Sequence, residues 1–239
     1  MKTNGAVLPH PALDHPDADL PEAVATPMRP DAFAHTDAEK VATIAHHFEQ
    51  IMHTLGLDLA DDSLKGTPRR VAKMFVNEVF SGLKPTNKPK PTLFENRYGY
   101  AGMLVEHGIG VHSFCEHHFV PILGKAAVAY YSSGKVIGLS KLDRIVKYYA
   151  ARPQVQERLT EQIAAELKRV LGTEDVAVLI DELYGQRNFH DEQAEDSDRF
   201  DASRYEHFVK KSYRLGDALW GVFSMSVLTR TPEFRQASV

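Results

Sequence analysis

The sequence predicts an α+β fold, because patterns typical of helices and patterns typical of strands occur in separate runs. Two stretches of helical periodicity, 36–56 and 67–82, come first. A stretch rich in β-branched and aromatic residues follows at 103–131, and two more helical patterns lie beyond it. This order differs from the strict alternation of strand and helix in a doubly wound parallel sheet.

Composition and charge exclude several classes of function. The 239 residues are 43% hydrophobic and 25% charged, which is typical of one large globular domain with an extension. A net charge of −4, from 28 basic and 32 acidic residues, provides no basic field for nucleic acid or an anionic membrane. No stretch approaches the ~20 apolar residues of a membrane span, no secretory signal is evident, and a single cysteine suits a reducing compartment. We expect a cytoplasmic protein without nucleic-acid or membrane partners.

The chain is expected to begin with a mobile arm, residues 1–35, which is rich in Pro, Ala, Asp and His and carries no chemistry. Residues 36–239 are predicted to form one domain. Thr36 and Glu39 have the spacing of a capping box and begin an amphipathic helix that ends at Gly56.

A second helix is predicted to begin at Thr67–Pro68 and to end at Gly82. Its cations, Arg69, Arg70 and Lys73, lie near the helix N-terminus, where the helix dipole disfavours positive charge. Basic residues on a helix face are ordinarily solvated surface residues, but this placement slightly favours a role in holding an anion.

The second half of the chain provides the expected sheet. Glycines interrupt residues 103–131, which predict two or three strands. The other expected elements are a short strand at 135–138, helices at 141–150 and 154–171, and strands at 176–180 and 218–228. Residues 182–217 are rich in Asp, Glu, Arg and His and are expected to be a long loop or an insertion.

Cys115-Glu116-His117-His118 is the densest group of metal-binding and proton-transferring side chains. Cysteine and histidine at this spacing can share one zinc ion. Residues three apart on a regular strand point to opposite faces, so the backbone would have to turn at this point. The alternative is that Cys115 is a buried small hydrophobe and that both histidines are surface residues.

Two later helix starts carry candidate ligand-binding residues. Ser140 is expected at an N-cap, with Lys141 and Arg144 in the first turn, so that N–H groups and two cations converge on phosphate oxygens. Ser140 as a simple cap is the alternative. Gln156 and Glu157 begin the next helix, where Glu157 either accepts two N–H bonds from a guanine edge or acts only as a favourable charge.

Together these segments resemble the GTP cyclohydrolase I family. The likeness runs from about residue 62 to residue 181, through DDSLKGTPRRVAKMFVNEVFSGL, CEHHFVPILGKAAVAYY, VIGLSKLDRIVKYYAARPQVQERLTEQI and LGTEDVAVLID. The resemblance implies a tunnelling fold (T-fold) with N-terminal helices, an antiparallel sheet and two adjacent helices. It also implies a homo-oligomer, commonly a decamer, in which the sheets form a β-barrel and the active sites lie between subunits.

The same resemblance implies the substrate, the metal and the site. The zinc ligands fall on Cys115 and His118, a proton-transferring histidine falls on His117, and guanine recognition falls on Glu157 with Gln156 beside it. The triphosphate-binding positions are Arg70, Lys73, Ser140, Lys141 and Arg144. The implied reaction is attack of a zinc-activated water on C8 of GTP, loss of formate and reclosure to 7,8-dihydroneopterin triphosphate. Zinc suits this attack because it lowers the pKa of bound water to about 7.

The sequence departs from the family pattern after Asp181. There the family supplies a second catalytic histidine, a cysteine as third zinc ligand and an arginine, whereas this chain continues LYGQRNFH. An ungapped register puts Gln186 at the ligand position; a register with an insertion resumes at HFVKKS, with His207 as the catalytic histidine. The candidate third ligands are His190, Asp191, Glu192 and His207, unless this acidic segment is a solvated loop.

Three functions are therefore considered. The first is a zinc-dependent GTP cyclohydrolase I. The second is a paralogue that keeps the nucleotide pocket but performs different chemistry, with Tyr184, His190 or His207 as proton donor. The third is an inactive subunit that binds guanine nucleotides or regulates active homologues. Three observations distinguish these functions. Bound zinc with formate release indicates the first, metal with a different product indicates the second, and nucleotide binding without metal or turnover indicates the third.

Overall fold

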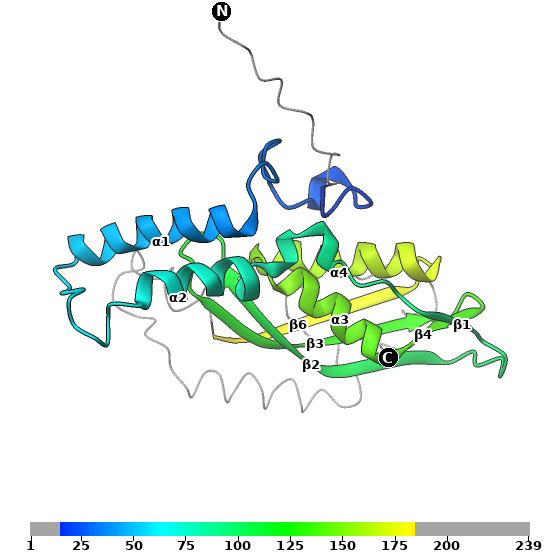
Figure 1. Cartoon of the computed structure of the whole chain (residues 1–239). Coiled ribbons are helices and arrows are strands. Elements are labelled where there is room, and N and C mark those ends of the chain that lie inside the picture. The colour runs from blue at the N-terminus through cyan, green and yellow to red at the C-terminus, as the bar shows by residue number, and fades with distance from the viewer. Residues whose placement is uncertain (1–14, 185–239) are drawn as a thin grey trace, which may run out of the picture. The chain divides into compact units, whose positions relative to one another are not determined.

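The computed structural model describes residues 15–184 (Figure 1). The chain divides into two compact units, Met1–Lys88 and Pro89–Val239, and this boundary falls inside the segment 36–239 that the sequence predicts as one domain. The predicted strand at 218–228 lies outside the described residues, as does the segment 182–217 beyond Tyr184. Within residues 15–184, every helix is too short or too polar to span a bilayer.

The first unit has local structure in part of the segment predicted to be an arm. Residues 15–35 contain a 3-10 helix, Glu22–Val24. The carboxylate of Asp17 accepts the Thr26 N–H at 2.8 Å, and Leu20 is buried. The mobility of the arm stays a prediction.

Helix α1, Asp37–Thr54, begins where the capping box predicts it. The Thr36 hydroxyl accepts the Glu39 N–H at 3.3 Å, and the Glu39 carboxylate accepts the Thr36 N–H at 2.7 Å. These hydrogen bonds from the Thr36 backbone and side chain hold the pKa of Glu39 below its ordinary value. The helix start is therefore fixed by two reciprocal bonds, one of which is accepted by the carboxylate.

Helix α2, Thr67–Met74, packs against α1 and has Pro68 in its first turn, as the sequence predicts. The helix ends earlier than Gly82 because its hydrogen bonding changes. The Phe80 N–H donates to the Phe75 carbonyl at 3.1 Å, which gives a π-helical turn over Phe75–Val79. Two 3-10 turns follow, Ser81–Leu83 and Pro85–Asn87.

The described part of the second unit is built on a four-stranded sheet with the order β5-β2-β3-β6. Strand β2 (Met103–Cys115) pairs antiparallel with β3 (Pro121–Tyr131), which pairs antiparallel with β6 (Val176–Tyr184). Strand β5 (Pro153–Gln154) pairs parallel with the end of β2. The stretch 103–131 thus forms two strands, and β6 continues past the predicted end at 180. Strands β1 (Leu93–Glu95) and β4 (Lys135–Ile137) form a separate antiparallel pair.

Helices α3 (Leu139–Ala150) and α4 (Gln156–Leu171) pack on this sheet, α3 against β2 and α4 against β6 (Figure 1). Alternating residues of β2 face the helices, and the last of these buried positions is Cys115. Other buried residues of this unit include Ile145, Tyr149 and Ile163. Burial of this apolar layer fixes the end of β2, which is where the candidate site begins.

Candidate active site

The Cys115–His118 segment forms a turn between β2 and β3. The Cys115 N–H donates to the Val120 carbonyl at 2.8 Å, and the Phe119 N–H donates to the Cys115 carbonyl at 2.8 Å. Phe119 has φ +56°, in the left-handed region that residues other than glycine rarely adopt. The backbone turn that a shared metal ion would require is therefore present.

The turn brings Cys115 and both histidines together. Nδ1 of His117 and Nδ1 of His118 each lie 3.9 Å from Sγ of Cys115. Two ligands of one tetrahedral zinc ion, with Zn–S of about 2.3 Å and Zn–N of about 2.0 Å, are about 3.6 Å apart. The thiol and either imidazole fit two positions of such a site, and the two equal distances do not distinguish His117 from His118.

A third metal ligand does not come from the described part of the chain. Within residues 15–184, no group of three or more His, Cys, Asp or Glu side chains is arranged to hold a metal ion. The sequence candidates for this position, His190, Asp191, Glu192 and His207, lie outside the described residues, and so does the predicted catalytic role of His207.

Glu116 links the turn to helix α4. One of its carboxylate oxygens pairs with the guanidinium of Arg158, and the other lies 3.8 Å from Nε2 of His117. Nε of Arg158 also donates to Oε1 of Gln154 at 3.2 Å. Sequence reasoning missed Arg158 because one arginine inside a helical pattern carries no signal, and the pairing arises only when β5 brings α4 beside the turn.

The beginning of α4 lies close to the turn. Cys115 pairs with Gln154 between β2 and β5, and α4 begins two residues later, at Gln156. The Gln156 side-chain amide donates to the Ile180 carbonyl at 2.9 Å, whereas Glu157 is exposed in the first turn. Of the two residues predicted at the guanine position, Gln156 is held by β6 and Glu157 presents its carboxylate to solvent.

Helix α3 corrects the prediction that Ser140 is an N-cap. The N-cap is Gly138, and Ser140 lies inside the first turn. Gly138 takes this place because it is extended, with φ −65° and ψ 132°, while its carbonyl accepts the Lys141 N–H at 2.7 Å. Ser140, Lys141 and Arg144 still lie together near the start of α3, so a hydroxyl and two cations remain close to its N-terminal N–H groups.

These phosphate-type residues and the Cys115 turn lie at opposite ends of α3. Ser140 is in the first turn, whereas Ala150 ends the helix four residues before Gln154, the partner of Cys115. A rise of about 1.5 Å per residue separates the two ends by about 15 Å. A ligand that contacted both the phosphate-type residues and the Cys115 turn of one chain would have to span that distance.

The other two predicted phosphate-binding residues, Arg70 and Lys73, are on α2 in the first unit. The Arg70 guanidinium donates to the Ser63 carbonyl at 3.0 Å and to Oγ1 of Thr67 at 2.8 Å. Arg70 is thus held against the start of its own helix, while Lys73 is exposed.

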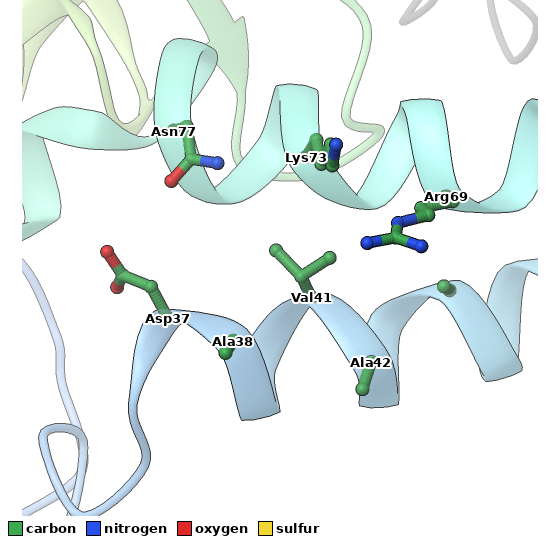
Figure 2. Close-up of a pocket in the computed structure, with 8 residues that line it drawn as sticks. Asp37, Ala38, Val41, Ala42, Arg69, Lys73 and Asn77 are labelled. Carbon is green, nitrogen blue, oxygen red and sulfur yellow. The ribbon is translucent and has the colours of Figure 1, made fainter.

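Lys73 lines a pocket of about 520 Å³ between α1 and α2 (Figure 2). Figure 2 shows Val41 of α1 pointing toward α2, with the guanidinium of Arg69 beside it. The remaining lining residues are Asp37, Ala38, Ala42, Ala45 and Asn77. Arg69, not Arg70, accompanies Lys73 in this pocket because residues four apart share a helix face. In the sequence, the spacing of four residues between Arg69 and Lys73 was the signal that these two cations share a helix face.

The chain was compared with known proteins. A sequence profile of the GTP cyclohydrolase I family matches residues 44–190. A protein of Flavobacterium johnsoniae named GTP cyclohydrolase 1 is 59% identical over 165 residues, which cover 69% of this chain and 74% of that protein. Proteins of the same name from Vibrio parahaemolyticus and Escherichia coli are 54% identical over 156 residues and 50% identical over 173 residues. These alignments cover 65% and 72% of this chain, and 71% and 78% of the respective relatives.

The fold and the site together define the class of this protein. It is an α+β protein in which a turn at the end of a sheet presents a cysteine and two histidines beside the start of a helix. The profile match covers more than half of this chain and extends beyond the quoted segments at both ends. The chain belongs to the GTP cyclohydrolase I family.

Proposed function

We propose that this protein is a zinc-dependent GTP cyclohydrolase I. It opens the guanine ring of GTP at C8, adds water, and forms formate and 7,8-dihydroneopterin triphosphate for folate and pterin biosynthesis in the cytoplasm. Family membership supports hydrolysis of GTP. The observation that carries the proposal is the approach of the Cys115 thiol to 3.9 Å from the imidazoles of His117 and His118, because this separation suits two ligands of one zinc ion.

Cys115 and His118 are the proposed zinc ligands. When bound, zinc supplies a nucleophile at neutral pH, because it lowers the pKa of bound water to about 7. Catalytic zinc sites commonly have three protein ligands, so a third is proposed to come from His190, Asp191, Glu192 or His207.

His117 and His207 are the proposed proton-transferring residues. The His117 ring lies between Sγ of Cys115 at 3.9 Å and a carboxylate oxygen of Glu116 at 3.8 Å. A neighbouring carboxylate restricts the orientation of an imidazole. The ring is exposed, so it can reach a bound substrate from this position.

Substrate binding is proposed to use cations of α2 and residues at the starts of α3 and α4. Glu157 accepts the N–H groups of the guanine edge, and Gln156 holds the helix start. Arg70, Lys73, Ser140, Lys141 and Arg144 bind the triphosphate. As the family resemblance implies, the protein is proposed to be a homo-oligomer, a decamer, with active sites between subunits.

A second candidate is a protein that binds a purine nucleotide with different chemistry or without turnover. One observation favours it: the described residues provide no group of three metal-binding side chains. The phosphate- and guanine-type residues would then serve binding or regulation.

A paired assay on one unchelated preparation separates these functions. Zinc is measured by elemental analysis, and GTP turnover is followed by formate release and by the fluorescence of oxidised neopterin. About one zinc per chain with both products supports the proposed cyclohydrolase. Metal with a different product supports the divergent paralogue. GTP binding without zinc or product rejects the cyclohydrolase and supports a binding subunit.

A further inference from the structure

Arg158 of helix α4 contacts the Cys115–His118 turn. Its guanidinium pairs with the carboxylate of Glu116, which lies between the two proposed zinc ligands in the sequence. We infer that Arg158 is a positioning residue that holds this turn in the conformation in which the thiol and the two imidazoles meet. The inference deepens the proposed function and rests on it for the role of the turn in metal binding.

The Arg158–Glu116 pair is shielded from water. The Arg158 side chain is 15% exposed and the Glu116 side chain is 27% exposed. Fully exposed ion pairs contribute little because solvent and salt screen them, whereas a shielded and hydrogen-bonded pair resists separation. This pair is therefore able to restrain the backbone of the turn.

Arg158 is itself anchored by a buried pair of glutamines. Gln154 and Gln162 have no exposed surface. The Gln154 amide nitrogen donates to Oε1 of Gln162 at 2.8 Å and to the Tyr149 carbonyl at 2.9 Å, which leaves Oε1 of Gln154 to accept Nε of Arg158 at 3.2 Å. The orientation of the Gln154 amide is thus fixed from both sides, and it fixes the guanidinium in turn.

Gln154 holds the backbone of Glu116, and Arg158, which Gln154 contacts, holds its side chain. The Glu116 N–H donates to the Gln154 carbonyl at 3.0 Å, while its carboxylate is held by Arg158. The second carboxylate oxygen lies 3.8 Å from Nε2 of His117. Loss of the guanidinium would release this carboxylate and, with it, one restraint on the His117 ring.

Direct contact with the substrate is a different role, and the contacts of Arg158 argue against it. Two of the three guanidinium nitrogens are used, Nε by Gln154 and one terminal nitrogen by Glu116. Arg158 also lies one residue beyond Glu157, and its side chain is far less exposed than that carboxylate. Its effect on the reaction is therefore expected through the turn.

The single cysteine provides a direct test, because alkylation of this chain reports on the turn alone. The rate of alkylation by iodoacetamide is measured on full-length, metal-free protein for wild type, Arg158→Gln and Arg158→Lys. We expect Arg158→Gln to raise the rate at least about tenfold, and Arg158→Lys to restore most of the protection since the ion pair is kept. Arg169→Gln is the matched control: Arg169 is also on α4 and pairs with a carboxylate, that of Glu166, away from the turn.

Zinc affinity is the second readout, measured by competition with a chromophoric chelator. Loss of a residue that orients a metal ligand weakens affinity about 10- to 100-fold, so we expect this change in Arg158→Gln, with kcat lowered more than the KM for GTP is raised. Circular dichroism checks that each variant folds. If Arg158→Gln does not fold, Glu116→Gln removes the same pair from the other side.

The outcomes separate this inference from the proposed function. An alkylation rate in Arg158→Gln within twofold of wild type, or an equal rise in Arg169→Gln, overturns the positioning role. A wild-type protein that binds no zinc and forms no neopterin overturns the proposed function instead, while the alkylation rates still decide whether Arg158 holds the turn.

Discussion

The side-chain amide of Gln156 donates a hydrogen bond to the main-chain carbonyl of Ile180 at 2.9 Å, which ties the first residue of α4 to β6. The next residue, Glu157, is exposed. Two neighbouring residues that the family resemblance assigns to guanine recognition thus have different surroundings. Gln156 fixes the position of the helix start, and Glu157 is left as the group that a ligand can reach.

Replacing Glu157 therefore affects GTP much more than replacing Gln156. A hydrogen bond to a charged group contributes about 1.5–3 kcal/mol, so we expect Glu157→Gln to lower kcat/KM for GTP about 10- to 150-fold. Gln156→Ala is expected to lower the melting temperature and to change kcat/KM less. Steady-state kinetics and thermal unfolding measure both effects. Glu161→Gln, one turn further along α4, is the control, and an equal loss in that variant would count against recognition by Glu157.

The two histidines of the turn are expected to differ in metal binding. His118→Ala should lose zinc because it removes a proposed ligand, whereas His117→Ala should keep zinc and lose turnover, by about 100-fold or more, because it removes a proton-transferring group. Since both Nδ1 atoms lie 3.9 Å from Sγ of Cys115, the structure permits the opposite assignment. Elemental analysis of the two purified variants decides it: zinc retained in His118→Ala and lost in His117→Ala would exchange the roles.

The cations of α2 allow a test of phosphate binding with an internal control. Arg69 and Lys73 line the same pocket, but only Lys73 and Arg70 are proposed to bind the triphosphate. We expect Lys73→Ala and Arg70→Ala each to raise the KM for GTP about tenfold, with a dependence on salt weaker than that of wild type. Arg69→Ala should change KM by less than about twofold. KM values measured at low and high ionic strength check this prediction. A large effect of Arg69→Ala on KM would indicate that the phosphate contact lies in the α1–α2 pocket.

Local signals in the sequence predicted most of the elements. The Thr36 capping box, the Pro68 helix start and the Gly172 helix end are all found where the sequence places them, because each depends on residues close together in the chain. The prediction of Ser140 as the N-cap of α3 was wrong. Gly138 and Ser140 are both acceptable caps, so the residue types alone do not select between them.

The sequence predicts which types of residue form the candidate site, but not how these residues are arranged. Cysteine and histidine at this spacing indicate a metal, but whether they meet depends on the turn between β2 and β3, which includes a positive φ at Phe119 that no local propensity predicts. The Arg158–Glu116 pair joins residues 42 positions apart, and it requires the parallel pairing of β5 with β2. Such contacts depend on topology, and single-sequence patterns do not contain them.

Gly172 should be sensitive to substitution for a purely conformational reason. It ends α4 with φ +64°, and a Cβ added to it would meet no atom within 4 Å. Gly172→Ala is therefore expected to lower the free energy of unfolding by about 1–2 kcal/mol, and Gly172→Asn by less, since asparagine tolerates this conformation better. Gly110→Ala is the control, because the φ of Gly110 lies outside the left-handed region and an added Cβ would make only an ordinary contact, at 3.8 Å from His112. Denaturant unfolding of the three variants compares them, and an equal loss in Gly110→Ala would contradict the conformational explanation.

The capping box of α1 predicts a stability difference that depends on pH. Hydrogen bonds from Thr36 lower the pKa of Glu39 from its ordinary value of 4.5, so the folded state favours the ionised carboxylate. The contribution of Glu39 is fully present above about pH 4.5 and is lost as the pH falls through the lowered pKa of the folded state. We expect Glu39→Gln to lower the melting temperature by about 2–4 °C at pH 7 and to make little difference at the acid end. Glu49→Gln, on the same helix but outside the capping box, is the matched control. Melting curves of wild type and both variants from pH 7 downward measure the effect, and a difference for Glu39→Gln that stayed constant with pH would show that the carboxylate does not stabilise the helix start.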